Sequence, residues 1–199
     1  ISAINTTDAL CNGNSNGALT VNITGGAGPF QYSINNGTTY QGGNIFNGLV
    51  QGNYSIIVQD ANGCTTTQPA VINEPAALVI NSIPVGSTCS YANGTLTLNG
   101  VGGTGVYQYS IDNGVSYVAG NVFNNVLAGN YSVVIQDANG CTTTANAIVI
   151  DAPAPVISNA LPTDVTCFGL ANGQVAVTAN GGTGTLQYNI NGGVFQPAS

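Results

Sequence analysis

The feature that most constrains this chain is an internal repeat of about 77 residues, because a fixed long period means that one structural unit is used several times. Cys11, Cys89 and Cys167 each precede an Asn-Gly turn and a segment in which apolar and polar residues alternate. These segments read NGALTVNITGG (16–26), NGTLTLNGVGG (93–103) and NGQVAVTANGG (172–182). The chain therefore begins the same unit three times.

A second block of the repeat fixes how many copies are complete. GNYSIIVQDANGCTTT (52–67) recurs as GNYSVVIQDANGCTTT (129–144), whereas the third copy reaches Ser199 before its equivalent. Acidic and Pro-Ala-rich joints, NEPAA (73–77) and DAPAP (151–155), separate the copies and are short enough to make a semi-rigid array. The predicted domains are repeat 1 (1–75), repeat 2 (76–153) and a truncated repeat 3 (154–199). Because half a sandwich cannot bury its apolar faces, we expect these residues to be part of a longer array.

Within each repeat the hydrophobic period is two, which is typical of half-buried strands. Leu19, Val21 and Ile23 fall on one face of their segment, and Asn-Gly pairs supply the positive φ angles that tight hairpins need. Six or seven short strands in about 77 residues predict an all-β fold of tandem immunoglobulin-like antiparallel β-sandwiches. Tyr54 and Tyr131 occupy the position of a tyrosine corner, in which the hydroxyl bonds back to the backbone.

Composition excludes most chemistry. Lysine, arginine and histidine are absent, and seven carboxylates give a net charge of −7. Without histidine or lysine the chain has no ordinary general base near neutral pH, so we expect no enzyme activity, no catalytic residue and no cofactor other than calcium. An anionic chain repels phosphate groups, which excludes nucleic acid, and no apolar run approaches the roughly 18 residues of a membrane span.

The repeat resembles the SprB-type repeat of the very long surface adhesins of gliding Bacteroidota. That pattern runs from a cysteine through a Gly-rich turn, a GGTGPYxYS-like segment and an Asn-Gly turn to L-x-x-G-x-Y-x-V-x-V-x-D-x-x-G-C. Here it reads Cys89, NGTLTL, GGTGVYQYSIDNG and VLAGNYSVVIQDANGC, ending at Cys141. One departure is isoleucine at 34, 111 and 190, where tryptophan is common in the family.

The resemblance implies an extracellular protein, exported by type IX secretion, that forms a structural and adhesive segment of a cell-surface filament. Its expected partners are further repeats of the same chain, surface polysaccharide and lateral copies of itself. The alternative function is an array of carbohydrate-binding modules attached to a secreted enzyme. Five cysteines in a polar, Gly-rich chain independently favour an oxidising, extracellular location.

The cysteines Cys11, Cys64, Cys89, Cys141 and Cys167 allow two patterns of disulfide. Intervals of 53 residues from Cys11 to Cys64 and 52 from Cys89 to Cys141 suggest one bond inside each repeat. An immunoglobulin-like order instead places these two positions at opposite ends of the sandwich, too far apart for a bond that needs Cα atoms within about 7 Å. Stacking of repeats would then favour Cys11 with Cys141, and Cys89 with the following copy.

Two further groups of polar residues are candidate sites. Asp60 with Asn62, and Asp137 with Asn139, could offer oxygens to calcium, although Asp-x-Asn-Gly is also what a tight turn prefers. We favour the turn, because no second carboxylate lies nearby in the sequence. Tyr40 and Tyr117 fall in loop-like stretches and are predicted to be exposed contact residues. Other tyrosines alternate with apolar neighbours, which favours core packing over a sugar-stacking surface.

Overall fold

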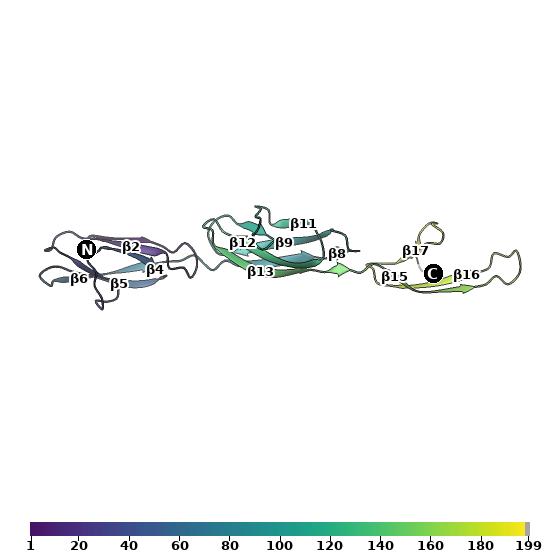
Figure 1. Cartoon of the computed structure of the whole chain (residues 1–199), viewed down its shortest axis with the longest axis horizontal. Helices are drawn as coiled ribbons and strands as arrows, with labels where there is room; N and C mark the ends of the chain where they lie inside the picture. The colour runs from purple at the N-terminus through teal and green to yellow at the C-terminus, as the bar shows by residue number, and fades with distance from the viewer. Residues whose placement is uncertain (198–199) are drawn as a thin grey trace. The chain divides into compact units, whose positions relative to one another are not determined.

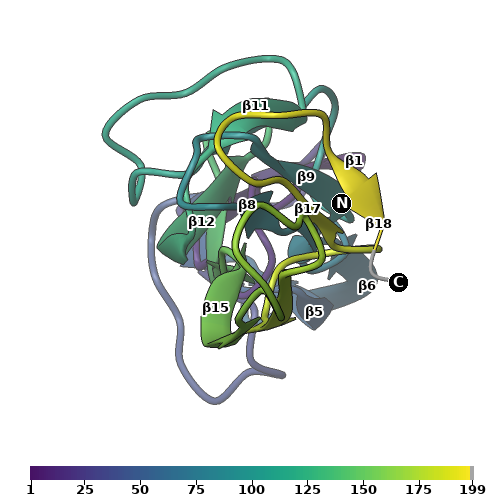
Figure 2. The same cartoon turned by 90° about the vertical axis from the view of Figure 1, so that its right-hand side faces the viewer.

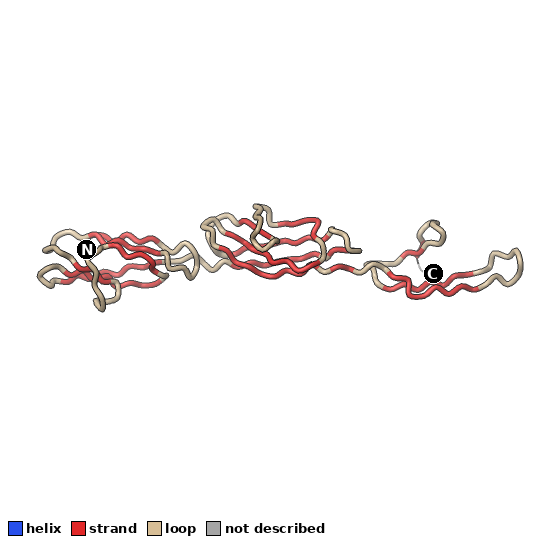
Figure 3. Tube along the Cα trace, in the orientation of Figure 1, coloured by secondary structure: helices blue, strands red, loops and turns tan. Residues whose placement is uncertain are grey.

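The computed structural model describes residues 1–197, and this part of the chain consists of strands and loops with no helix (Figures 1 and 3). No helix that could cross a membrane is therefore found among these residues. Repeat 1 holds β1 (Ala3–Thr7), β2 (Gly17–Asn22), β3 (Gln31–Ser33), β4 (Ile45–Leu49), β5 (Gly52–Gln59) and β6 (Thr65–Ile72). Repeat 2 holds β7 (Val79–Val85), β8 (Ser87–Thr88), β9 (Gly94–Val101), β10 (Gln108–Ser110), β11 (Val122–Val126), β12 (Gly129–Gln136), β13 (Thr142–Val149) and β14 (Asp151–Ala152). Repeat 3 holds β15 (Val156–Thr163), β16 (Gln174–Asn180), β17 (Gln187–Tyr188) and β18 (Gln196–Pro197).

The first repeat has two three-stranded sheets, ordered β1-β2-β4 and β3-β5-β6. All four neighbouring pairs are antiparallel, and β5 and β6 pair from Gly52↔Ile72 to Gln59↔Thr65. Lettered in chain order, with β4 as strand E, the sheets are A-B-E and C-F-G, which is the strand arrangement of immunoglobulin-like sandwiches. The second repeat repeats it as β7-β9-β11 and β10-β12-β13. The predicted all-β, immunoglobulin-like fold is confirmed.

Alternation along the strands places apolar side chains between the two sheets. Leu19 and Val21 of β2 are 1% and 0% exposed, and they pack against Ile56 and Val58 of β5 and Ile72 of β6. The corresponding residues of repeat 2 are also buried: Leu96, Leu98, Val133, Ile135 and Val149. Each full repeat therefore has the inner layer that the period of two predicts.

The two tyrosines predicted to form corners make the expected bonds. The Tyr54 hydroxyl donates to the Val50 carbonyl oxygen at 2.8 Å, and the Tyr131 hydroxyl donates to the Leu127 carbonyl oxygen at 2.9 Å. Each tyrosine lies at the start of its F strand, β5 or β12, and its bond fixes the chain that leads into that strand.

The chain forms two compact units, each made of several segments. The first unit contains Ile1–Ile80, Gly100–Gln108 and Ile135–Thr143. The second contains Asn81–Asn99, Tyr109–Val134 and the described residues from Thr144 onward. Each unit thus contains one of the two Pro-Ala-rich joints together with the loops that contact it.

Repeat 3 differs from the others because its strands form two separate pairs, β15-β16 and β17-β18. In Figures 1 and 2 the loop between β17 and β18 stands apart from the β15-β16 ribbon. Side chains that would be buried in a closed sandwich, such as Val175 and Ile157, are here 50% and 66% exposed.

Candidate functional site at the repeat joints

The joint after repeat 1 is held by the acidic residue of its linker. The Glu74 carboxylate accepts hydrogen bonds from the side-chain amide of Asn12 and the backbone N–H of Gly13, both at 2.7 Å. Asp8 reinforces the contact from the other side, because its carboxylate accepts the backbone N–H of Asn73 at 2.8 Å. Hydrogen bonds to a carboxylate are stronger than neutral ones. The linker is therefore tied to the loop that follows Cys11.

The joint after repeat 2 uses Asp151, which occupies the same position in its repeat as Glu74. Its carboxylate accepts the Ser90 backbone N–H at 3.0 Å and the hydroxyls of Ser90 and Ser87, each at 3.0 Å. The Ser90 N–H lowers the pKa of Asp151 most, against a smaller opposing effect of desolvation, and the two hydroxyls lower it further. A short parallel pairing of β14 with β8 extends the contact. Both linkers are thus clamped by an acid to the loop of the repeat that they leave.

The linker also bonds to the repeat that it enters. The backbone N–H of Gly103 donates to the Ala76 carbonyl oxygen at 2.8 Å, and that of Gly182 donates to the Pro153 carbonyl oxygen at 2.8 Å. The chain approaches so closely that a Cβ at Gly102 would lie 2.0 Å from the Ala77 carbonyl oxygen, and Gly102 has a φ of 82°. A Gly-Gly turn is therefore required at the start of this contact.

A disulfide crosses the first joint. Cys11 of repeat 1 is bonded to Cys141 of repeat 2, with the Cα atoms 5.7 Å apart. The Asn139 side-chain amide donates to the Leu10 carbonyl oxygen at 3.0 Å beside the bond. A surface hollow of about 430 Å³ borders both cysteines.

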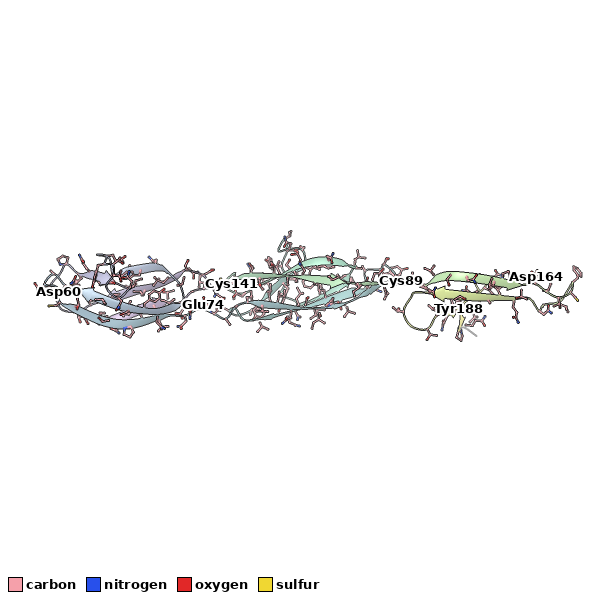
Figure 4. All side chains as sticks on the ribbon, turned by 90° about the horizontal axis from the view of Figure 1, so that it is seen from below. Asp60, Glu74, Cys89, Cys141, Asp164 and Tyr188 are labelled. Carbon is pink, nitrogen blue, oxygen red and sulfur yellow. A yellow bond between two sulfur atoms is a disulfide. The ribbon has the colours of Figure 1, made fainter. Side chains whose placement is uncertain are left out.

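The alternative of one disulfide inside each repeat is wrong in this structure. The backbone N–H of Cys64 donates to the Asp60 carboxylate, and the Cys64 carbonyl oxygen accepts the Asp60 N–H. Figure 4 shows Asp60 at the opposite end of repeat 1 from Glu74. Glu74 is the residue that holds the loop after Cys11. The length of the sandwich therefore separates Cys11 from Cys64. Cys64, Cys89 and Cys167 are free and exposed.

The repeated Asp-Ala-Asn-Gly-Cys turn presents the cysteine of this bond. In repeat 2 one oxygen of Asp137 accepts the backbone N–H groups of Asn139 and Cys141 at 3.0 and 2.9 Å. The other oxygen accepts the N–H of Thr104 at 2.8 Å, and Asp137 is only 5% exposed. Its carboxylate is thus part of the turn, and it orients Cys141 toward the joint.

Asp60 makes the same turn in repeat 1, with its carboxylate bonded to the N–H groups of Asn62, Cys64 and Ala27. Desolvation raises the pKa of Asp60, but these backbone bonds, led by that of Cys64, hold it below its ordinary value. These bonds make the Asp60 carboxylate part of the turn that the Asp-x-Asn-Gly sequence predicts. Among residues 1–197 no three His, Cys, Asp or Glu side chains gather as metal ligands do.

The two tyrosines predicted to be exposed contacts have similar environments. Tyr40 is 37% exposed, and Tyr117 is partly exposed. A Cβ added at Gly114 would lie 3.0 Å from the Tyr117 hydroxyl. Each of these rings folds back over the glycine of its Asn-Gly turn, and the same arrangement at Gly37 places the Tyr40 hydroxyl 3.1 Å away.

Comparison with known proteins agrees with this repeat structure. The family model described as the SprB repeat matches residues 3–39 and 159–195. The starts of the two matches are separated by the length of two repeats. Two segments of the chain therefore match the SprB repeat. Each match runs from the first strand of the SprB repeat through the β2-type strand to the Asn-Gly turn, and so includes the loop that carries Cys11 or Cys167. No curated protein matches the sequence.

Solved structures of low similarity were also found. One is a C-terminal 282-residue fragment of intimin in complex with the intimin-binding domain of the translocated intimin receptor, at 15% identity and a TM-score of 0.41. The alignment covers 81% of this chain and 66% of that one. Another is the N-terminal eight Ig domains of Down syndrome cell adhesion molecule isoform 1.30.30, at 17% identity and a TM-score of 0.32, covering 68% of this chain and 24% of that one.

The clamping role of Glu74 and Asp151 was not among the predicted sites. A signal was present, because an acid stands at the same place in both linkers of a chain with only seven carboxylates. The period of two could not reveal its function, since the partners of these acids lie about 60 residues earlier, in loops.

Proposed function

We propose that this chain is a structural and adhesive segment of an extracellular cell-surface filament, of the type formed by gliding adhesins. The observation that carries the proposal is the disulfide between Cys11 and Cys141, because it joins one repeat to the next instead of stabilising a single domain. A covalent bond at that place lets consecutive repeats resist tension. The SprB repeats support the same function.

The extracellular location rests on the chemistry of the joint. Disulfides persist in oxidising compartments and are rare in the cytosol. The bond borders an open hollow, where a reducing cytosol would have access to it. Export by type IX secretion and a role in gliding belong to the same proposal, as do its partners, namely further repeats, surface polysaccharide and lateral copies. We propose no catalysis, since the chain lacks the bases that hydrolytic chemistry uses.

Labelling of intact cells tests the location. Antibodies raised against the 199-residue chain should label unpermeabilised cells of the source organism, and mild treatment with proteinase K should remove the label. Labelling that requires lysis would reject the proposal. Adhesion is tested with beads that carry the chain, which should adhere to polysaccharide-coated glass more than beads carrying an unrelated acidic β-sandwich of similar size.

A further inference from the structure

The turn after Cys11 places an exposed Asn-Gly pair at the first joint. The turn is closed by the Asn14 N–H, which donates to the Cys11 carbonyl oxygen at 3.2 Å, and Asn12 and Gly13 lie between these two residues. Both are exposed, and Gly13 has a φ of 75°. Asn-Gly pairs form succinimides readily, because a glycine has no Cβ to hinder attack of its backbone nitrogen on the preceding side-chain amide.

Glu74 holds the two nitrogen atoms that take part in this reaction. One carboxylate oxygen accepts the backbone N–H of Gly13, the nucleophile, at 2.7 Å. The other accepts Nδ2 of Asn12, the leaving group, also at 2.7 Å. The Gly13 nitrogen must lose its proton to attack, and an anionic acceptor stabilises the N–H form and disfavours a second negative charge beside it. The clamp therefore suppresses the reaction.

The source of this protection distinguishes the pair from another Asn-Gly turn of the same repeat. In the turn at 60–63 the Gly63 N–H donates to the Asp60 carbonyl oxygen at 2.9 Å, so the acceptor belongs to the turn itself. The acceptor of the Gly13 N–H is instead in the linker, 61 residues away in the sequence. Movement of the linker therefore frees the Gly13 nitrogen but leaves the Gly63 nitrogen bonded.

We propose that Asn12 is a modification site controlled by Glu74, and that its deamidation opens the first joint irreversibly. When the linker moves away, the Gly13 nitrogen forms a bond to Cγ of Asn12. The Cγ–Nδ2 bond breaks, and Nδ2 leaves as ammonia with the proton of the Gly13 nitrogen. Water then opens the succinimide to aspartate or isoaspartate, and the ammonia takes up the proton of the new carboxyl group. The proposal does not depend on the location of the chain at the cell surface.

The product cannot restore the clamp. Nδ2 of Asn12 donates both to Glu74 and, at 3.2 Å, to the Pro75 carbonyl oxygen. A carboxylate at position 12 would face these two acceptors without a hydrogen to share, and it would bring a like charge to the position of the present hydrogen bond. Isoaspartate also adds a methylene to the backbone, which displaces the Gly13 N–H. The disulfide from Cys11 to Cys141 keeps the two repeats connected after the clamp has opened.

The second joint has the same clamp without the reactive group. Ser90 follows Cys89 as Asn12 follows Cys11. The Asp151 carboxylate accepts the Ser90 backbone N–H and the Ser90 hydroxyl, each at 3.0 Å. A serine has no side-chain amide and forms no succinimide. Serine is therefore the matched replacement that keeps a hydrogen-bond donor at position 12.

The first experiment measures deamidation of the 199-residue chain at mildly alkaline pH, with tandem mass spectrometry of peptic peptides to locate the modified residue. Asn12 should deamidate about fivefold faster or more in the Glu74→Ala chain, because the Gly13 N–H has lost its acceptor. The rate at Asn62 should be the same in both chains. Asp164→Ala, which removes a carboxylate elsewhere, should leave the rate at Asn12 unchanged.

The second experiment installs the product directly. In the Asn12→Asp chain the Gly13 amide should exchange about fivefold faster or more than in the wild type, as measured by NMR, whereas in the Asn12→Ser chain it should stay slow. The double variant Asn12→Asp/Glu74→Gln should restore slow exchange. Its glutamine can donate to the new carboxylate and accept the Gly13 N–H, which reverses the direction of one hydrogen bond and removes the like charge.

Three results would overturn the proposal. Equal deamidation rates at Asn12 in the wild-type and Glu74→Ala chains would mean that the clamp does not protect this residue. A slower rate in the Glu74→Ala chain would make Glu74 a base that assists the reaction. Slow Gly13 exchange in the Asn12→Asp chain would show that the clamp accepts the product, so that deamidation would not open the joint.

Discussion

At the scale of single residues, this chain uses carboxylates without any basic side chain to pair with them. The carboxylates of six of its seven acidic residues accept hydrogen bonds from backbone N–H groups, hydroxyls or amides: Asp8, Asp60, Glu74, Asp112, Asp137 and Asp151. Such bonds favour the ionised form of the acid. The acids of this chain therefore link loops together, a role that acidic residues share with lysine and arginine in most proteins.

Asp112 gives a pH dependence that can be predicted. The hydroxyls of Ser110 and Ser116, followed by the Ser116 backbone N–H, lower the pKa of Asp112 to about 2. Because the folded-state pKa is below the unfolded value of about 3.9, this stabilisation is present above pH 4 and is lost as the pH falls toward 2. We expect the thermal unfolding temperature of repeat 2 to fall through this window.

The variant Asp112→Asn provides the comparison, because asparagine already stands at the equivalent position of repeat 1. There the Asn35 side-chain oxygen accepts the Ser33 hydroxyl and the Thr39 backbone N–H at 2.9 Å each. The variant should fold, and between pH 4 and 2 it should lose less stability than the wild-type chain in differential scanning calorimetry. Identical pH profiles for the two proteins would contradict the role assigned to this carboxylate.

At the scale of elements, the linker acid is predicted to hold its loop closed. Glu74→Ala removes the acceptor of the Gly13 N–H, and its loss should cost about 1 kcal/mol locally, so that this amide exchanges about fivefold faster. Amide exchange followed by NMR measures the change. The control is Asp164→Ala, which removes an exposed carboxylate that accepts no hydrogen bond within the described residues. If both variants changed the exchange rate of the Gly13 amide equally, a general effect of charge would explain the result, and not the loss of the hydrogen bond to Glu74.

The elements also show what the sequence could and could not predict. Strand β2, the Asn-Gly turns and the bonds of Tyr54 and Tyr131 follow from local patterns within one repeat, and the structure has all of them. The partner of Cys11 depends instead on how one repeat meets the next, because its disulfide joins it to Cys141 of repeat 2. Periodicity within a repeat cannot supply that information.

At the scale of the whole molecule, the disulfide changes how the chain responds to force. When the chain is pulled from its two ends, tension passes directly from Cys11 to Cys141 through the bond. The segment of chain between them, a sequence separation of 130 residues, then carries no tension and is not extended. An extended chain spans at most about 3.5 Å per residue, so the shielded length is about 450 Å. The bond would therefore withhold most of repeats 1 and 2 from stretching even if their sandwiches opened.

Single-molecule force spectroscopy with and without a reductant measures this length. We expect the total extension of the oxidised chain to increase by about 450 Å when dithiothreitol is added, since the bond borders an open hollow. The Cys11→Ser variant should show the longer extension in either buffer, whereas Cys64→Ser, which removes a free thiol, should behave as the wild type does. An increase of only about 190 Å would correspond to the 53 residues between Cys11 and Cys64, and would place the bond inside repeat 1 instead of across the joint.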